Sequence, residues 1–407
     1  MKKIKLGDVA KIITGPFGSQ LHSSDYVTKG IALVMPINIG DRYIIEDSIA
    51  KISELDAKRL SRYKLELGDI VYSRRGDVEK CALVRKRNVG FLCGTGCLRI
   101  RVDKNLISPD FLSLYLSQNY IKKWVLDNSN GATMPNLNSE TLIHLPLNLP
   151  SLEIQKKIST ILSAFDEKIS INKKINATLE AMAKTIYDYW FLQFDFPDEN
   201  GKPYKSSGGK MIYNAELKRE IPFGWEVKKL SSLLIKNSTP FNYQTTAPTI
   251  DLSVMPSNSI SLDKLNSSDL FSTNLFEMKE GDILFGSIRP YLKKAGIAPC
   301  DGVFAGTIYS YKVKNFSDYN FALSTLCNEN FFNYAIQIST GTRMPAVNNE
   351  VLLSYKVAYS EKIAELFNRI DIKKFICKNC QENFKLETLR DFLLPMLMNG
   401  QVKIEGG

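Results

Sequence analysis

Two arginine-containing segments carry the clearest chemical signal in this chain. The letters SRRGD occupy residues 73–77, and GSIRPY occupy residues 286–291; each segment closely follows a copy of the letters GDI. An arginine guanidinium can hold a phosphate or grip the edge of a guanine, and nearby Lys and Tyr side chains can support either contact. One such segment alone would be read as an ordinary charged surface loop. Its recurrence at the same place in two parts of the chain favours binding of a polyanion.

Other basic and polar side chains extend this candidate site. The basic and aromatic candidates are Arg74, Arg75, Lys80, Arg85, Lys86, Arg87, Arg289, Tyr291, Lys293, Lys294 and Arg343, and Arg99 and Arg101 belong to the same basic stretches. The hydroxyl and amide candidates for contacts with bases are Ser19, Gln20, Asn38, Asn136, Asn138, Asn242, Gln244 and Asn348. The last group is weaker, because Asn residues also hold turns; this applies above all to Asn138 and Asn348.

The composition is that of a basic protein with room for two or three domains. The net charge of +10 over 407 residues favours a polyanionic partner, although many soluble proteins are basic. No apolar run approaches the roughly 20 residues that span a bilayer, and no signal peptide is evident, so we expect a cytoplasmic protein without a membrane partner. Seven cysteines then predict reduced thiols. With two histidines and one CxxC pair, Cys377 and Cys380, we expect no metal site.

Motifs of common enzymes are absent from the sequence. There is no GxxxxGKS or GxxxxGKT, no HExxH and no GxSxG. The letters GTGCLR at residues 94–99 begin like a dinucleotide fingerprint but lack its third glycine. We therefore expect no catalytic residues and no cofactor in this chain.

A long helix is predicted over residues 151–194. Apolar residues recur at alternating intervals of four and three, which is the heptad repeat of a coiled coil. The polar Lys168 and Asn172 interrupt the repeat and are candidates for fixing the register of helix pairing. The predicted seam positions are Ile158, Ile161, Phe165, Lys168, Asn172, Ile175 and Leu179.

A second long helix is predicted over residues 360–398, with Pro395 as the point where regular pairing fails. Its cysteines fall on the predicted seam and are interpreted as small core residues. The seam positions are Ile363, Leu366, Ile370, Cys377, Cys380 and Phe384. Each helix could pack only on its own domain, but the repeat described next favours antiparallel pairing of the two.

An internal repeat relates the two halves of the chain. The letters GATMPNLNSETL at residues 131–142 reappear as GTRMPAVNNEVL at residues 341–352, and the GDI copies at residues 68–70 and 281–283 match in the same order. A collinear set of matches indicates a tandem duplication. The halves also differ: Leu6 to Gly68 spans 62 positions and Leu230 to Gly281 spans 51, which suggests two sites of one kind with different specificities.

The predicted fold class is α+β, with two strand-rich domains separated by a long antiparallel two-helix coiled coil in a tandem repeat with an approximate two-fold axis. Short apolar runs such as residues 31–34 and 69–72 predict strands. The predicted parts are a first domain at 1–150, a helix at 151–194, an irregular connector at 195–224, a second domain at 225–359, a helix at 360–398 and a tail at 399–407.

The ordered set of motifs resembles the specificity subunit of type I restriction–modification systems over essentially the whole chain. The resemblance rests on the paired segments at 131–142 and 341–352, on GDIVYSRRG at 68–76, on GSIRPY at 286–291, and on the first helix with its exit at 201–225. It implies two target-recognition domains that each recognise one half of a bipartite double-stranded DNA target, with helices that set the spacing. Individual base contacts do not transfer, because the recognition loops vary within the family.

The same resemblance implies a non-catalytic chain within a larger complex. The expected partners are two modification subunits, which methylate adenine with S-adenosylmethionine, and restriction subunits, which need ATP and Mg²⁺. The alternatives from other classes are a fused restriction–methylation enzyme or nuclease, for which the chain lacks a cofactor domain, and a coiled-coil adaptor without a DNA role. The adaptor would account for the helices but not for the repeated arginine loops.

Overall fold

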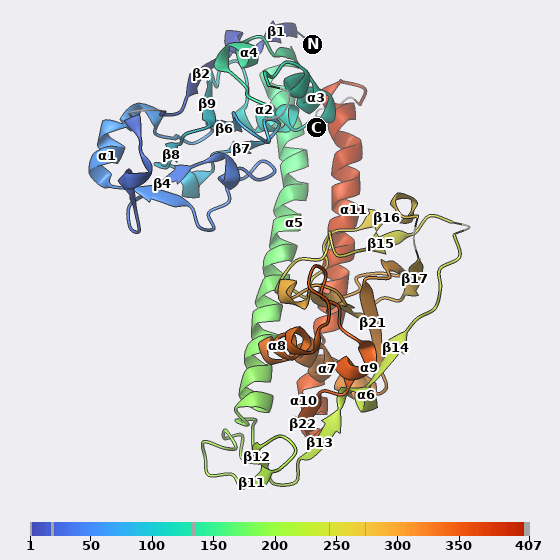
Figure 1. The fold of residues 1–407 in the computed structure, drawn as a ribbon. Coiled ribbons are helices and arrows are strands. Elements are labelled where there is room, and N and C mark those ends of the chain that lie inside the picture. Colours follow the sequence, from blue (N-terminus) through green and yellow to red (C-terminus); the bar gives the residue numbers. More distant parts are fainter. Residues whose placement is uncertain (1, 18–19, 132–134, 244, 273, 403–407) are drawn as a thin grey trace. The chain divides into compact units, whose positions relative to one another are not determined.

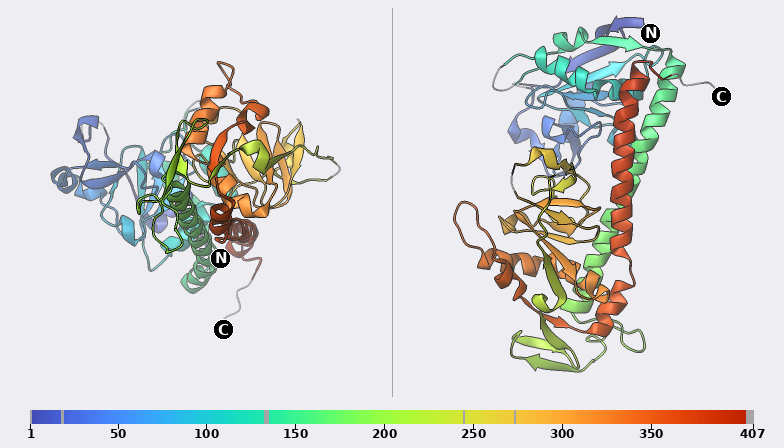
Figure 2. Two further views of the ribbon diagram at one scale, coloured as in Figure 1. Left: turned by 90° about the horizontal axis from the view of Figure 1, so that it is seen from below. Right: turned by 90° about the vertical axis from the view of Figure 1, so that its right-hand side faces the viewer.

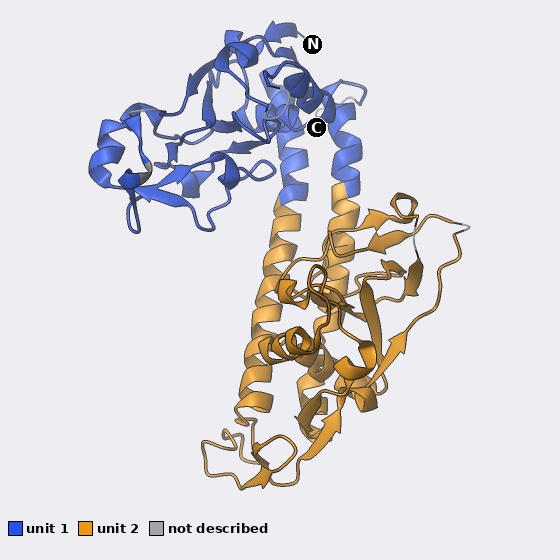
Figure 3. Cartoon of the chain, in the orientation of Figure 1, with its two compact units in different colours: residues 1–166, 388–407 blue, residues 167–387 orange. Residues whose placement is uncertain are grey.

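The computed structural model describes residues 2–17, 20–131, 135–243, 245–272 and 274–402. The chain divides into two compact units (Figure 3): unit 1 comprises residues 1–166 and 388–407, and unit 2 comprises residues 167–387. In the part of the chain that is described, no helix is both long and apolar enough to cross a membrane.

Unit 1 contains two four-stranded sheets (Figure 1). The first has the order β2-β9-β6-β7 and is antiparallel; the second has the order β3-β5-β4-β8, in which β4 and β8 run parallel. The strands are β1 (Lys2–Lys5), β2 (Ala10–Thr14), β3 (Tyr26–Val27), β4 (Ile31–Val34), β5 (Ala50–Ile52), β6 (Ile70–Ser73), β7 (Cys81–Leu83), β8 (Leu92–Cys93), β9 (Cys97–Val102) and β10 (Pro146–Leu149), and the helices of the globular part are α1 (Glu54–Arg59), α2 (Pro109–Leu116), α3 (Asn119–Asp127) and α4 (Ser139–Ile143). The predicted strands at 31–34 and 69–72 correspond to β4 and β6.

Unit 2 repeats this arrangement. Its sheets have the orders β14-β21-β18-β19 and β16-β15-β20-β17, and β15 and β20 run parallel. The elements are β11 (Met211–Asn214), β12 (Arg219–Pro222), β13 (Glu226–Lys229), β14 (Leu234–Asn237), β15 (Pro248–Ile250), β16 (Asn266–Ser267), β17 (Leu275–Met278), β18 (Ile283–Gly286), β19 (Ala295–Ile297), β20 (Gly302–Ala305), β21 (Ile308–Val313) and β22 (Lys356–Tyr359), with helices α6 (Leu230–Leu233), α7 (Tyr319–Leu326), α8 (Glu329–Ile338), α9 (Asn349–Leu353) and α10 (Glu361–Asn368).

The topology confirms the duplication and locates the divergence. The first sheets match strand for strand, and both units join an early strand to a late one, β1 to β10 and β13 to β22. The second sheets share a three-stranded centre, β5-β4-β8 in unit 1 and β16-β15-β20 in unit 2. Unit 1 adds β3 beside β5, whereas unit 2 adds β17 beside β20. The length difference between the halves therefore falls in this second sheet.

Two long helices run through both units, α5 (Leu152–Tyr187) and α11 (Ile372–Met398). Figure 2 shows green α5 and red α11 side by side. Within unit 2 their pairing is antiparallel, because Asn172 of α5 contacts Asn383 of α11 while the later Asn176 contacts the earlier Asn379. The prediction of paired antiparallel helices is confirmed.

The phase of the predicted seam is wrong at one of its two heptad positions. Ile158 and Asn172 are buried and Phe165 and Leu179 are half-buried, but Ile161 and Ile175 are 38% and 42% exposed and the Lys168 side chain is 47% exposed. The residues one position later are buried instead: Leu162, Ile169, Asn176 and Ala183. At residues 175 and 176 the error arises because the buried residue is an asparagine and the exposed one an isoleucine, so a search for apolar letters selected the flank. On the second helical segment, Ile363, Cys377 and Cys380 are buried and Leu366, Ile370 and Phe384 are half-buried.

The asparagines of the stripe are hydrogen-bonded across the helix pair. The Asn172 side-chain amide donates to Glu382 at 2.8 Å and to Asn383 at 2.9 Å, and Asn379 donates to Asn176 at 2.8 Å. Lys168 lies on the flank and forms an ion pair with Glu382 at 3.3 Å. Buried polar groups of this kind are satisfied in only one register, which is how they specify pairing.

The second predicted long helix is interrupted. α10 ends at Asn368, and α11 begins at Ile372. The Asn320 side chain donates to the carbonyls of Phe367 and Ile370 at 3.0 and 2.7 Å, and the Asp371 carboxylate accepts from the Lys374 N–H as a helix cap does. At the other end α11 continues through Pro395, and Leu397 and Met398 are buried in the core of unit 1, so packing does not fail there.

The predicted irregular connector is instead a folded hairpin. After a short π-helical turn at Asp188–Leu192, β11 and β12 pair antiparallel. Phe194, Phe196 and Trp225 are buried around it, with the Phe196 and Trp225 rings stacked at 5.2 Å. The Arg219 guanidinium covers the Phe194 ring at 4.4 Å. Aromatic burial and cation–π contact thus order a segment whose glycines and serines suggested a linker.

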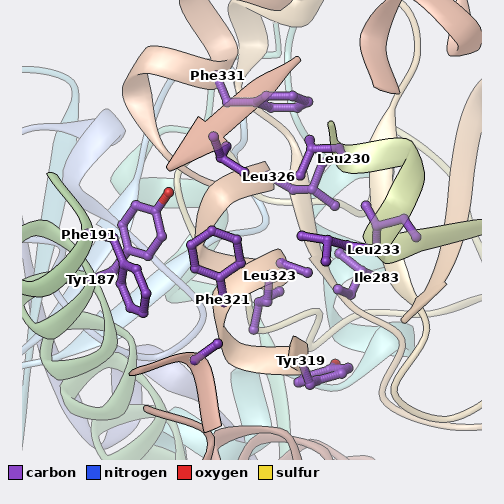
Figure 4. Close-up of a cluster of buried hydrophobic side chains, with 14 of the residues drawn as sticks. Tyr187, Phe191, Leu230, Leu233, Ile283, Tyr319, Phe321, Leu323, Leu326 and Phe331 are labelled. Carbon is purple, nitrogen blue, oxygen red and sulfur yellow. The ribbon is translucent and has the colours of Figure 1, made fainter. Parts of the chain in front are cut away.

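The core of unit 2 joins the end of α5 to the globular part (Figure 4). Tyr187 and Phe191 face Phe321 of α7, with the Phe191 and Phe321 ring centroids 4.8 Å apart. The Tyr187 hydroxyl lies 3.0 Å from the Thr325 hydroxyl, which satisfies both groups inside the core. The globular part of unit 2 and its helix therefore share one core.

Candidate functional site

The two strongest sequence signals, the arginine segment and the repeated motif, are joined in space. In unit 1 the Gly76 N–H donates to the Pro135 carbonyl at 3.2 Å, and the Leu137 N–H donates to the Arg74 carbonyl at 2.8 Å. In unit 2 the Arg289 N–H donates to the Pro345 carbonyl at 2.7 Å, and the Val347 N–H donates to the Ser287 carbonyl at 2.9 Å. We name each β6–β7 or β18–β19 turn, with the motif segment bonded to it, a turn–motif site.

These hydrogen bonds show how the residues of the two arginine segments correspond. Arg74 corresponds to Ser287, Arg75 to Ile288 and Gly76 to Arg289, so Arg75 and Arg289 are one position apart. The backbone supports this correspondence, since Gly76 and Arg289 both adopt a left-handed conformation, with φ of 75° and 50°. A non-glycine residue pays a steric penalty in this conformation. Unit 2 thus holds its arginine at a strained position that glycine occupies in unit 1.

The backbone strain at Arg289 should have a measurable effect on the free energy of unfolding. We expect the Arg289→Gly variant to be more stable than Arg289→Ala by about 1 kcal/mol, because both remove the guanidinium but only glycine adopts positive φ without a steric penalty. Urea unfolding of the two variants gives the difference. Gly76→Ala is the matched control: an added Cβ meets nothing within 4 Å there, so its expected loss of about 1 kcal/mol isolates the backbone effect. Equal stability of the two Arg289 variants would contradict the left-handed assignment.

The asparagines of the repeated motif hold helix ends. The Asn138 side-chain oxygen accepts from the Thr141 N–H at 2.6 Å and caps α4, and the Asn348 oxygen accepts from the Glu350 N–H at 2.8 Å and caps α9. Asn is a preferred cap residue because its side chain satisfies N–H groups that the first helical turn leaves unpaired. Of the two roles considered for these residues, the structure shows the turn-holding one.

The candidates Arg85, Lys86 and Arg87 do not join the turn–motif site. They follow β7, whereas Arg74, Arg75 and Lys80 lie in the turn that precedes it, at the opposite end of the β6–β7 hairpin. Arg85 pairs with Asp110 at 2.9 Å, and Arg87 pairs with Glu46 at 3.1 Å, all with exposed side chains. The sequence neighbourhood was misleading here because a hairpin separates residues that are only ten positions apart.

Two arginines of the same basic stretch have structural roles. Arg99 is 6% exposed and donates from Nη1 to the carbonyls of Arg62 and Lys64, each at 2.9 Å, and burial lowers its pKa. Arg101 pairs with Asp69 at 2.7 Å, and the hydrogen bond that it donates to Asp69 raises its pKa. These side chains hold β9 to its neighbours and are not available to a ligand.

Within the turn–motif sites the basic side chains are partly paired. Lys80 forms an ion pair with Asp77, and the hydrogen bond that it donates to Asp77 raises the pKa of Lys80. Lys293 pairs with Glu329 at 2.6 Å, and Lys294 donates to the Leu252 carbonyl. Arg75, Arg289, Arg343 and Tyr291 are exposed, and Arg74 is half-buried. The exposed Arg75 of unit 1 and Arg289, Arg343 and Tyr291 of unit 2 are therefore the candidates best placed to meet a ligand.

Of the hydroxyl and amide candidates, Gln20 is held by its own unit. Its side-chain oxygen accepts from the Tyr63 hydroxyl at 2.8 Å, and its carbonyl accepts from Arg59. Ser19 and Gln244 lie outside the described residues. Asn38 is 3% exposed and donates to the Ile45 carbonyl at 3.2 Å, so it supports a turn.

Comparison with known proteins adds independent information. Residues 1–181 match the family model described as the type I restriction modification DNA specificity domain. The type I restriction enzyme MjaIX specificity subunit of Methanocaldococcus jannaschii is 25% identical over 100% of this chain and 94% of its own length. The HindI specificity subunit of Haemophilus influenzae is 28% identical over 53% of this chain and 46% of its own length.

A solved structure shares the fold. The S subunit of a type I restriction–modification system from M. genitalium superposes with a TM-score of 0.58 at 14% identity, over 97% of this chain and 95% of that one. The family match, the relative that aligns over the whole chain and this common fold agree with one another. The chain is therefore similar over its whole length to a specificity subunit of a type I restriction–modification system, and its residues 1–181 match the DNA specificity domain of that family.

Proposed function

We propose that this chain is a DNA sequence-specificity subunit in which residues 1–150 and 225–359 each recognise one half of a bipartite double-stranded DNA target. The observation that carries the proposal is that one turn–motif site occurs in each of two units whose first sheets have the same topology. Phosphate contacts would supply most of the affinity, and base contacts in the major groove would supply the specificity. The divergent second sheets give the two units different surfaces, as two different half-sites require.

We further propose that the helices at 151–194 and 360–398 set the gap between the half-sites and dock two modification subunits. Support for docking comes from apolar side chains on the helices that unit packing leaves exposed; they are Ile161, Ile171, Ile175 and Met182 on α5 and Phe375, Leu389 and Phe392 on α11. Exposed apolar residues gathered on one element favour a protein partner. The modification subunits would bind S-adenosylmethionine and methylate adenine.

The remaining partners and the location belong to the same proposal. Restriction subunits with bound ATP and Mg²⁺ would join the complex for cleavage, and this chain would hold none of these cofactors itself. The complex would meet its double-stranded DNA target in the cytoplasm. Cleavage and methylation would both depend on this chain for the choice of target.

The decisive experiment maps methylated adenines across the genome in cells with and without this chain, with its companion modification subunit present. We expect one bipartite motif that disappears on deletion and returns when the chain is restored. An unchanged set of methylated motifs would contradict the proposal. The bases of the two half-sites and the gap length follow from the same data.

Single arginine variants should act on one half-site each. We expect Arg75→Ala to weaken discrimination at one half-site and Arg289→Ala at the other, by about 5- to 150-fold, because a lost arginine–base contact is worth roughly 1–3 kcal/mol. Methylation rates on substrates with single changes in either half-site provide the measurement. Arg87→Ala is the control, since Arg87 pairs with Glu46 away from the turn–motif site. If either variant lost discrimination at both half-sites, the result would contradict the assignment of one arginine to each half-site.

A further inference from the structure

In both units, one loop connects the turn–motif site to the long helices. This loop joins β4 to β5 in unit 1 and β15 to β16 in unit 2, so it occupies equivalent places in the two topologies. In each unit it runs alongside the strand that leaves the turn: Arg42 bridges to Ala82 of β7, and Ser261 bridges to Ile297 of β19. Whatever holds this loop therefore also holds the strand that carries the turn.

In unit 1 the loop reaches the helices through Arg42. Its backbone N–H donates to the Cys81 carbonyl at 3.0 Å, directly after Lys80 of the turn. Its side chain is 9% exposed and forms an ion pair with Asp166 of α5. The other Asp166 oxygen accepts from Arg390 of α11 at 3.0 Å. One carboxylate thus ties the loop to both long helices.

In unit 2 the equivalent loop reaches α5 mainly through hydroxyl and backbone N–H donors. The Glu180 carboxylate accepts from the Ser259 hydroxyl at 3.0 Å, from the Ser261 N–H at 3.0 Å and from the Ser261 hydroxyl. Asp263 of the loop pairs with Lys173 of α5 at 3.0 Å. The loop is also bonded to the turn itself, since the Asn258 N–H donates to the Lys293 carbonyl at 3.0 Å. In unit 1 the loop supplies the Arg42 guanidinium to the Asp166 carboxylate. In unit 2 the loop supplies serine hydroxyls to the Glu180 carboxylate.

Each loop is held, directly or through a second ion pair, by a helix from the other half of the chain. The globular part of unit 2 lies in the second half of the chain, yet its loop is held by Glu180 of α5, which the first half contributes. In unit 1 the loop contact continues through Asp166 to Arg390 of α11, which the second half contributes. A carboxylate that accepts from donors in several directions fixes the orientation of the donors as well as their distance. Such contacts orient the loop as well as attaching it.

We propose that these loops are clamps that set the orientation of each turn–motif site on the helices, with Arg42, Asp166 and Glu180 as positioning residues that make no DNA contact. The inference rests on the proposed function, because orientation matters only if the two sites must meet half-sites at a fixed gap. Loosening a clamp lets its site tilt, so DNA with a gap one base pair longer or shorter is accepted. The bases recognised stay the same.

The test uses the full chain assembled with its modification subunit and a set of DNA substrates that differ only in gap length, from two base pairs shorter to two longer. Asp166→Asn and Glu180→Gln remove the charge with little change in shape. For each we expect the preference for the native gap over its neighbours to fall by about fivefold, the lower end of typical coupling between sites, with unchanged discrimination within half-sites. Glu153→Gln is the matched control, because Glu153 on α5 pairs with Lys157 of the same helix.

A conservative variant separates positioning from loss of folding. Asp166→Glu keeps the carboxylate that both Arg42 and Arg390 contact, so it should keep the gap preference that Asp166→Asn loses. Variants that melt at lower temperature but keep the wild-type gap preference would show that the loops are only structural and would overturn the inference. Loss of base discrimination without broader gap tolerance would overturn it as well. A wild-type complex that methylates no bipartite target would instead refute the proposed function.

Discussion

Insertion of four residues into each long helix, between Asp166 and Glu167 in α5 and between Glu387 and Thr388 in α11, should lengthen the preferred gap by one or two base pairs. Four helical residues advance the chain by about 6 Å and turn it by about 400°, a net rotation of about 40°. Two base pairs span about 7 Å, and one base pair turns the DNA by about 35°. The half-site bases should be unchanged, and the original target should lose methylation.

Two controls make this result specific to the helices. The same four residues inserted in the turn between β11 and β12 add equal length to the chain without changing the helices, so the native gap should be kept. Insertion into α5 alone should damage pairing, because Asp166 before the insertion and Asn172 after it could no longer both meet their partners on α11. The gap preference of all three proteins is measured as the methylation rate on DNA substrates that differ only in gap length. An unchanged gap after the double insertion would exclude the helices as the spacer.

The largest loss of stability is expected from Phe321→Ala. The Phe321 side chain is fully buried, and its ring lies 4.8 Å from that of Phe191 and 5.5 Å from that of Tyr359. Removing a buried aromatic ring leaves a cavity and destabilises a protein by about 3–5 kcal/mol. Because this ring joins α7 to the end of α5, unit 2 should unfold first while unit 1 keeps its structure.

Urea unfolding followed by hydrogen exchange in each unit measures this effect. Phe223→Ala is the matched control: the Phe223 ring is 60% exposed, so the loss should stay below about 1 kcal/mol. A single transition in which both units lose protection together would show that the effect is not confined to unit 2. A loss similar to that of Phe223→Ala would contradict the burial of Phe321.

The heptad period of the sequence predicted both long helices and their pairing, because apolar residues at this spacing form a stripe along a helix that a second helix can cover. It could not predict the phase at one of the two heptad positions, since Asn176 is buried whereas Ile161 and Ile175 are exposed. The break before Ile372 was also hidden, because it depends on the side chain of Asn320, about fifty residues away. Tertiary hydrogen bonds, which no local pattern encodes, account for both errors.

The candidate site, like the helices, could be predicted from the sequence only in part. The GDI copies and the repeated motif predicted that two equivalent sites exist, and their position after a strand was correct. That the turn and the motif bond to each other could not be inferred, because residues 76 and 135 are far apart in sequence. Charge alone also assigned too many residues to the site, since Arg99 and Arg101 bind carbonyl and carboxylate groups of the protein itself. The clamp residue Arg42 gave no signal at all, being a single arginine between two short strands.

The asparagines of α5 also bear on how the chain is made. The ribosome completes α5 at Tyr187 and begins α11 at Ile372, so the 184 residues 188–371 separate the two. At about 5–20 residues per second, this stretch takes on the order of 10–40 s. Throughout that time the face of α5 that α11 will cover meets water, where Asn172 and Asn176 are solvated at no penalty while a wholly apolar face would attract other nascent chains. The residues that fix pairing in the finished protein thus also protect the unfinished one from aggregation.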